Sequence, residues 1–131
     1  FVAYLCRNYI REKQSSGNDD MIKSGMLYIR EHFQESINVE SVASHAGFSR
    51  FYFSRQFKSI TGMTVMEYVQ FLRCRHAREL LLSGNCSVSK AAMESGFSDL
   101  SYFTKVFKGQ FGVLPSEVAR MKVAHTIRTD L

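Results

Sequence analysis

Positive charge is concentrated in residues 50–60, which contain Arg50, Arg55 and Lys58 but no acid. A guanidinium group can donate two parallel hydrogen bonds to paired acceptors, whereas an ammonium group acts as a point charge. Both groups suit a polyanionic partner. Basic residues on an exposed helix are equally typical of a plain solvated surface, so the charge alone leaves both interpretations open.

A second segment, residues 99–110, has a similar layout with less charge. Its charged residues are Asp99, Lys105 and Lys108, which sum to +1 against +3 for residues 50–60. Both segments also contain two phenylalanines spaced four residues apart, which on a helix share one face. The expected inward residues are Phe53 and Phe57 in the first segment and Phe103 and Phe107 in the second.

The opposite faces of these two segments are expected to be exposed. In the first segment they carry Arg50, Phe51, Ser54, Arg55 and Lys58. In the second segment they carry Leu100, Ser101, Thr104, Lys105 and Lys108. Because arginine can hold guanine O6 and N7 with two donors, Arg55 is the best candidate for reading a base, and Phe51 suits a thymine methyl. Arg50 and Lys58 are expected to contact phosphates.

The chain around these segments has a helical pattern. Hydrophobic residues make up 45% of the sequence and recur at helical spacing, and there is a single proline. These features predict an all-α protein with a packed core. Helices are expected over 1–13, from Asn18 or Asp19 onward, over 39–46, 50–60, 65–82, 88–95 and 99–110, and from Pro115 to about 122. The expected N-caps are Asn38, Ser49, Thr64, Ser87 and Ser98.

The two basic segments lie within an internal repeat. Residues 39–49, VESVASHAGFS, align with residues 88–98, VSKAAMESGFS, and five of the 11 positions are identical. Residues 51–67 align with residues 101–117 at six of 17 positions, after one inserted residue. Each copy has a short helix, a Gly-Phe-Ser turn and a second helix, which is the layout of a helix-turn-helix.

The turn of each copy leads to two further expectations. Gly47 and Gly96 are expected to have positive φ, which only glycine adopts without steric cost. Phe48 and Phe97 are expected to fill the small core of each copy together with the inward phenylalanines.

Many residues of the second copy also form a pattern at fixed spacing. They are Gly96-Phe97-Ser98-Asp99, Ser101-Tyr102-Phe103, Phe107-Lys108, Gly112 and Pro115-Ser116-Glu117. This pattern closely resembles the signature of the AraC/XylS family of bacterial transcription regulators. The first copy is similar at Ala43, Gly47-Phe48-Ser49, Phe57-Lys58, Thr61-Gly62, Tyr68 and Arg73. The resemblance covers about residues 20–120. Ala91 replaces a larger aliphatic residue of the pattern, so the second lobe is expected to pack more loosely.

The resemblance implies an all-α, seven-helix domain in which two helix-turn-helix lobes are joined by a long connecting helix. The expected boundaries are 1–18 for an upstream helix and linker, 19–122 for the DNA-binding domain and 123–131 for a polar tail. Within the domain, the first lobe would cover about 19–62, the connecting helix about 64–82 and the second lobe about 87–122. Recognition helices are implied at about 50–60 and 99–110, and groove contacts are implied for the outward residues of the second.

The resulting hypothesis is sequence-specific binding of double-stranded promoter DNA by a bacterial transcription regulator, with two recognition helices in successive major grooves. The net charge of +5 agrees with a nucleic-acid partner. An activator would also need RNA polymerase as a partner. Because the chain begins at Phe1 without Met, we expect it to be a fragment that lacks an upstream sensing or dimerisation domain. The alternative is a basic helical protein–protein interaction module.

Other chemistry has little support in the sequence. The histidines His32, His45, His76 and His125 do not pair with each other or with Cys6, Cys74 and Cys86 at metal-ligand spacing, so no metal site is expected. No nucleophile with a supporting base and no phosphate-binding glycine loop is found, so we expect no enzyme and no cofactor. The unpaired cysteines suit a reducing cytoplasm, where the domain would be associated with the nucleoid. No apolar run is long enough to span a membrane, so no membrane contact is expected in this fragment.

Overall fold

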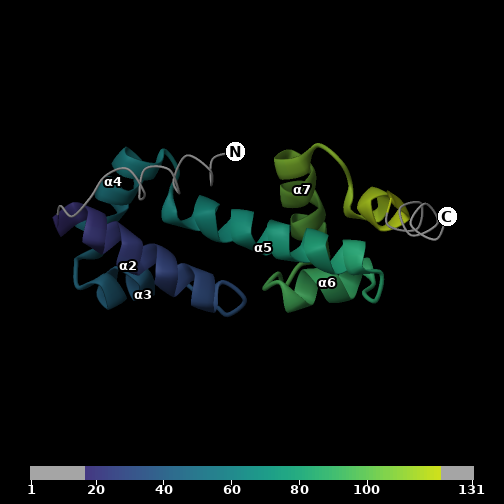
Figure 1. Ribbon diagram of the computed structural model, residues 1–131, viewed down its shortest axis with the longest axis horizontal. Coiled ribbons are helices and arrows are strands. Elements are labelled where there is room, and N and C mark those ends of the chain that lie inside the picture. The colour runs from purple at the N-terminus through teal and green to yellow at the C-terminus, as the bar shows by residue number, and fades with distance from the viewer. Residues whose placement is uncertain (1–16, 122–131) are drawn as a thin grey trace. The chain divides into compact units, whose positions relative to one another are not determined.

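The computed structural model describes residues 17–121, which form helices and no strand. The helices are α2 (Gly17–His32), α3 (Val39–Ala46), α4 (Arg50–Thr61), α5 (Val65–Ser83), α6 (Val88–Glu94) and α7 (Leu100–Phe111) (Figure 1). Residues 115–121 form a seventh helix within the described range. The predicted seven-helix, all-α class is therefore confirmed. The helix expected over 1–13 and the tail expected over 123–131 lie outside the described residues.

The chain divides into two compact units within α5, between Val69 and Gln70. The first unit contains α2, α3, α4 and the beginning of α5, and the second contains the rest of α5, α6, α7 and residues 115–121. Each unit therefore holds one copy of the repeat, and each is described separately below.

Most helix ends lie where the polar residues and glycines of the sequence place them. Asn38 accepts a hydrogen bond from the Ser41 N–H at 2.8 Å, and the Ser41 hydroxyl reciprocates, which makes a capping box. Ser49 and Ser87 also cap their helices through the side-chain oxygen. These interactions satisfy backbone N–H groups that a helix leaves without partners. Four of the five predicted N-caps, including Thr64 with its bond from the Glu67 N–H, are confirmed.

The fifth predicted cap, Ser98, is wrong. The N-cap of α7 is Asp99, whose carboxylate accepts hydrogen bonds from the N–H groups of Ser101 at 2.8 Å and Tyr102 at 3.2 Å. The cause is the residue inserted between the two blocks of the repeat. Ser49 directly precedes α4, but the extra residue moves Ser98 one position away from the start of α7. Asp99 then takes the capping position.

The core of the first unit forms where α2 packs against α3 and α4 (Figure 1). The buried residues of α2 include Met21, Ile22, Met26 and Ile29, which lie on one side of the helix. Phe53 and Phe57 of α4 are fully buried, with ring centroids 5.7 Å apart. Phe57 also lies 6.0 Å from the buried ring of Tyr68 on α5.

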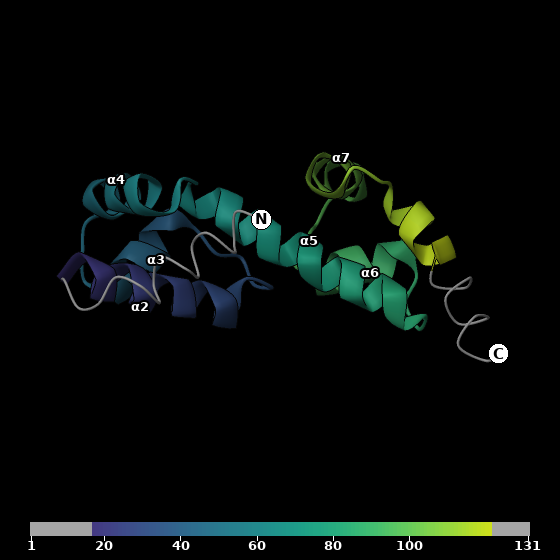
Figure 2. The same cartoon turned by 45° about the horizontal axis from the view of Figure 1, so that its top comes forward.

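The core of the second unit forms between α5, α6 and α7, which Figure 2 shows from a second side. Phe103 and Phe107 occupy the positions that Phe53 and Phe57 occupy in the first unit, and they are also fully buried. Around them the cluster contains Cys74, Ala77 and Leu81 of α5, Ala91 and Ala92 of α6, Phe97, and Val118.

The expectation that Phe48 and Phe97 both fill a core is half wrong. Phe97 is 5% exposed and lies 4.9 Å from the ring of Phe103, as expected. Phe48 is 40% exposed and contacts the exposed ring of Tyr52 instead. The physical reason is side-chain volume. The α2 face supplies two methionines and two isoleucines to the first core, whereas the corresponding α5 face supplies Cys74, Ala77 and Leu81 to the second. The second core therefore has room for one more aromatic ring.

Candidate nucleic-acid interface

Both units fold a similar glycine turn after the first helix of the repeat, and the second turn is the longer one. Gly47 has φ 88° and Gly96 has φ 107°, which confirms the predicted left-handed conformation. The N–H of Phe48 donates to the Ala43 carbonyl at 3.0 Å, and the N–H of Phe97 donates to the Ala92 carbonyl at 3.0 Å. The repeat in the sequence is thus a repeat of helix, turn and helix in three dimensions.

The five candidate residues of α4 all lie away from the buried phenylalanines. Arg50, Phe51, Arg55 and Lys58 are exposed and Ser54 is half-buried. Phe51 is 74% exposed although it is a large aromatic residue, and the Arg50 guanidinium lies 5.7 Å from its ring centroid. The guanidinium and the ring therefore lie within cation–π distance of each other.

The five candidate residues of α7 occupy the equivalent face. Leu100, Ser101, Lys105 and Lys108 are exposed and Thr104 is half-buried. The Thr104 hydroxyl donates to the Leu100 carbonyl at 2.9 Å, so it is engaged by its own helix backbone. The structure thus places each predicted set together on one helix face. That these residues contact DNA remains a prediction.

Tyr102 is an exposed residue of the α7 face that the sequence did not single out as a contact. Its hydroxyl accepts a hydrogen bond from Gln70 Nε2 of α5 at 3.2 Å. Burial lowers the pKa of the Arg73 guanidinium on α5, and the proximity of Tyr102 partly offsets this change. The Gln70–Tyr102 hydrogen bond joins the first turn of α7 to α5.

Two glutamates outside α4 pair with its outer cations. Arg50 Nη1 lies 3.6 Å from Glu40 Oε1 on α3, and Lys58 Nζ lies 4.0 Å from Glu67 Oε1 on α5. No pair of this kind forms with Arg55, Lys105 or Lys108 among residues 17–121. The sequence analysis missed both glutamates. A signal for Glu67 was present, because Thr64-x-x-Glu67 is a capping-box pattern, but Glu40 is ten residues from Arg50 and has no such signal.

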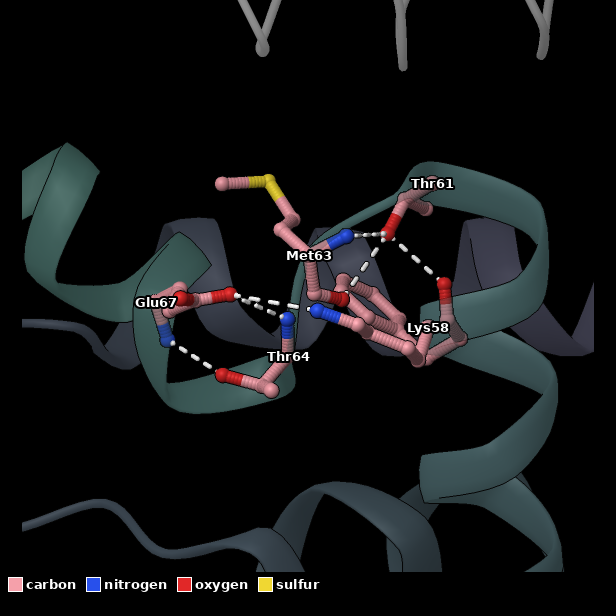
Figure 3. A network of polar contacts seen from close by, with 6 residues as sticks. Lys58, Thr61, Met63, Thr64 and Glu67 are labelled. Atoms are coloured by element: carbon pink, nitrogen blue, oxygen red, sulfur yellow. Dashed lines mark hydrogen bonds and ion pairs between the residues drawn. The ribbon is translucent and has the colours of Figure 1, made fainter.

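Figure 3 shows the network around Glu67 at the C-terminal end of α4. The same Glu67 oxygen that faces Lys58 accepts the Thr64 N–H at 2.8 Å. Next to it, the buried Thr61 hydroxyl lies 2.7 Å from the Phe57 carbonyl and accepts a bond from the Met63 N–H at 3.3 Å. The backbone between α4 and α5 is therefore held by side-chain hydrogen bonds at several points.

An open hollow of about 460 Å³ lies where α3 meets the first turn of α4. Its lining residues are Glu40, Ser44, Phe48, Ser49, Arg50 and Phe51. The exposed ring of Phe48 forms part of the lining of this hollow, whereas Phe97, the equivalent residue of the second unit, is buried. Phe48, which the sequence predicted in the core, is therefore a surface residue at the edge of the candidate interface.

The described residues contain no group of three histidine, cysteine or acidic side chains that could hold a metal ion. None of the helices in residues 17–121 is long and apolar enough to cross a membrane.

Comparison with known proteins gives a family match and several relatives. The family described as "Helix-turn-helix domain" matches residues 42–121. The chain is 38% identical over 98 residues to the regulatory protein PocR of Salmonella typhimurium, covering 75% of this chain and 32% of PocR. It is 33% identical over 104 residues to the transcriptional activator RhaS of Salmonella schwarzengrund, covering 79% of this chain and 37% of RhaS. The chain thus spans about a third of the length of these relatives.

A third relative is matched over most of its length. It is an HTH-type transcriptional regulator from the cgkA 5′ region of Pseudoalteromonas carrageenovora, 31% identical over 126 residues, with 88% of this chain and 75% of the relative covered.

Solved structures have the same fold. The DNA-binding domain of AdpA, determined in complex with a target DNA, superimposes with a TM-score of 0.72 at 29% identity and covers 83% of this chain and 96% of that domain. The C-terminal domain of AraT, a response regulator from Geobacillus stearothermophilus, superimposes with a TM-score of 0.72 at 30% identity, covering 77% of this chain and 84% of that domain.

Proposed function

Because the chain belongs to the AraC/XylS family of helix-turn-helix transcription regulators, we propose that it binds double-stranded promoter DNA in a sequence-specific manner through α4 and α7. One observation carries the proposal. The chain contains two helix-turn-helix units with a positive-φ glycine and a matching backbone hydrogen bond in each turn, and each presents a second helix whose outer face bears exposed cations. In helix-turn-helix proteins the second helix lies in the major groove.

The proposed contacts follow from the chemistry of each side chain. Arg55 lies one turn into α4, where it would read a guanine with two donors, and Phe51 would contact a thymine methyl. Arg50 and Lys58 at the ends of the face would contact phosphates. In the second unit, Ser101 and Lys105 would supply the polar contacts. The other proposed contact residues are Ser54, Leu100, Thr104 and Lys108.

The connecting helix supports binding of two successive grooves. Helix α5 has 19 residues and therefore a length of about 28 Å at 1.5 Å per residue. Successive major grooves on one side of DNA are about 34 Å apart. A connector of this length, with the width of the two units added, is compatible with two recognition helices one helical turn apart.

Further partners are proposed from the family and from the fraction of each relative's length that the chain covers. The chain spans about a third of PocR and RhaS, so we propose that a sensing or dimerisation domain accompanies it in the full-length regulator. By analogy with the activator RhaS, RNA polymerase is the proposed protein partner. The proposed location is the bacterial cytoplasm, on the nucleoid. In this proposal the domain has no catalytic role.

Selection of bound duplexes from a random library tests the function directly. We expect enrichment of two short motifs about one helical turn apart, with affinity that falls steeply as salt rises. The alternative function, a basic helical protein-interaction module, is supported by the same net charge of +5. It predicts no enriched sequence and no binding to duplex DNA at low salt, and that result would overturn the proposal.

A further inference from the structure

The cations of α4 are not equivalent in the free protein. Arg50 at the beginning of the helix and Lys58 in its last turn each face a glutamate from a neighbouring helix, at 3.6 Å and 4.0 Å. Arg55, between them, makes no ion pair within the described part of the chain. The paired residues are the two proposed phosphate contacts, and the unpaired residue is the proposed base contact.

We propose that Glu40 and Glu67 are positioning residues that compete with DNA phosphates for Arg50 and Lys58, and so lower the affinity of the first unit for the DNA backbone. This inference rests on the proposed function. It assigns a role to two acidic side chains that lie beside the interface rather than in it.

The exposure of the pairs makes such an exchange feasible. The side chains are 56% and 75% exposed in the Arg50–Glu40 pair and 57% and 60% exposed in the Lys58–Glu67 pair. Exposed pairs of this kind are weak because water screens the charges. Each cation can therefore leave its carboxylate when a phosphate oxygen approaches, because breaking the ion pair costs little free energy.

The exchange leaves a carboxylate without its partner next to a polyanion. The freed Glu40 would then take up a cation from solution. Cation uptake opposes the release of counterions from DNA, which drives backbone binding and sets its salt dependence. The two glutamates should therefore lower affinity and also make the salt dependence less steep.

The second unit lacks both pairs. The repeat places Ser89 opposite Glu40 and Leu100 opposite Arg50, so neither charge is present. Glu117 stands where Glu67 stands, and it accepts the Leu114 N–H at 2.7 Å, but no ion pair with Lys108 forms within residues 17–121. The competition is thus a property of the unit that has more cations.

Neutral variants of the same shape test the inference. Glu40→Gln removes the charge, and Glu67→Gln removes the charge but keeps an oxygen that can accept the Thr64 N–H. The matched control is Glu94→Gln, which breaks the exposed Lys90–Glu94 pair on α6 and changes the net charge by the same amount. Fluorescence anisotropy with a labelled duplex of mixed sequence, over a series of KCl concentrations, measures affinity and salt slope.

We expect Glu40→Gln and Glu67→Gln each to bind the duplex about 1.5- to 5-fold more tightly than Glu94→Gln. The slope of log affinity against log salt should become steeper by up to about 0.9 for each variant. In an Arg50→Gln background, Glu40→Gln should match Glu94→Gln, because the cation that it competes for is gone.

The outcomes separate this inference from the proposed function. If the wild-type chain does not bind duplex DNA at low salt, the proposed function fails. If the wild type binds but Glu40→Gln and Glu67→Gln behave like Glu94→Gln, the proposed function stands and the competition is overturned. An effect of Glu40→Gln that persists in the Arg50→Gln background would likewise overturn it, because the gain would then be general charge removal.

Discussion

The two units have one backbone plan but different surfaces and cores. Helices α4 and α7 each have 12 residues, bury phenylalanines at the fourth and eighth positions and end at a glycine with left-handed conformation. On the outer face, the first helix has three cations, two of them in ion pairs, and the second has a leucine at its first position and two cations that form no ion pair within residues 17–121. The difference indicates that the inward residues maintain the fold while the outward residues are free to set the strength of binding.

The same comparison changes the ranking that charge alone suggests. By formal charge the first unit should dominate binding, +3 against +1. Two of its three cations are paired with Glu40 and Glu67, however, so its advantage in binding the DNA backbone should be smaller than the formal charge suggests. We therefore expect the base contact proposed for Arg55 to contribute more to the difference between the units than formal charge alone predicts.

The most direct way to break this comparison is to truncate the central cation of each helix. Arg55→Ala should reduce affinity for the selected duplex by about 1–3 kcal/mol, because a bidentate contact with a base is lost. Lys105→Ala should cost less, because lysine supplies a single point charge. Titration of both variants against the selected duplex and against a scrambled duplex measures the two effects.

A conservative variant sharpens the result. Arg55→Lys retains the charge but cannot donate two parallel bonds, so it should lose most of the preference for the selected duplex and keep affinity for the scrambled one. Equal losses for Arg55→Ala and Lys105→Ala would contradict the assignment of unequal roles to the two helices.

The next largest effect concerns the cores. Gly25 of α2 lies so close to α4 that an added Cβ would be 2.4 Å from Phe53 Cζ and 2.8 Å from its Cε1. The Phe53 ring is fully buried and cannot move aside cheaply, so Gly25→Ala should lower the free energy of unfolding by about 1–3 kcal/mol. Gly109→Ala is the matched variant in the second unit, because nothing lies within 4 Å of its added Cβ.

Gly109 lies inside α7 without positive φ, so alanine there should stabilise the protein by about 0.5–1 kcal/mol. Urea unfolding of both variants measures the two changes. A lower free energy of unfolding for Gly25→Ala together with a higher one for Gly109→Ala would support the difference in packing. An unchanged free energy of unfolding for Gly25→Ala would show that the α2–α4 contact is looser than described.

Much of this fold could be predicted because it depends on local chemistry. The capping residues and the glycines act within four residues of their own position, and the spacing of the phenylalanines identifies the buried faces. The predicted start of α7 is one residue too early, because the residue inserted after Ser98 moves the beginning of the helix away from it. The exposure of Phe48 depends on the volume that α2 supplies, and the Glu40–Arg50 pair depends on how α3 and α4 cross. Neither property is encoded in nearby residues.

A further difference between the cores is chemical. The second core contains Cys74, whose thiol is fully buried, and burial raises its pKa from 9.0 to about 12. The folded state thus keeps the proton in a range where the unfolded chain loses it. The stability that this contributes is complete below pH 9 and is lost as the pH rises toward 12.

We therefore expect the free energy of unfolding to fall between pH 8 and pH 10, by about 1.4 kcal/mol from this group. Cys74→Ala should remove this part of the fall, even though it lowers stability overall. Cys86→Ala, which changes a half-exposed cysteine of the same unit, should keep the fall unchanged. Urea unfolding at the two pH values, with all three proteins compared, isolates the contribution of the buried thiol. An identical pH dependence in wild type and Cys74→Ala would rule it out.

The smallest effects concern the starts of the two recognition helices. Ser49→Ala and Asp99→Ala each remove a side-chain acceptor from an N-cap and should lower the free energy of unfolding by about 1 kcal/mol. Asp99 accepts two N–H groups where Ser49 accepts one, and its charge favours the positive end of the helix dipole, so its loss should be the larger. Ser98→Ala should have almost no effect, because the inserted residue has moved it out of the capping position.

DNA binding is expected to respond in the opposite sense at one of these sites. Asp99→Ala removes a negative charge from the N-terminus of α7, so it should destabilise the unit and yet raise its affinity for phosphate, whereas Ser49→Ala should only destabilise. A loss of stability at Ser98 equal to that at Asp99 would mean that the helix begins one residue earlier and that the two units are more alike than the structure shows.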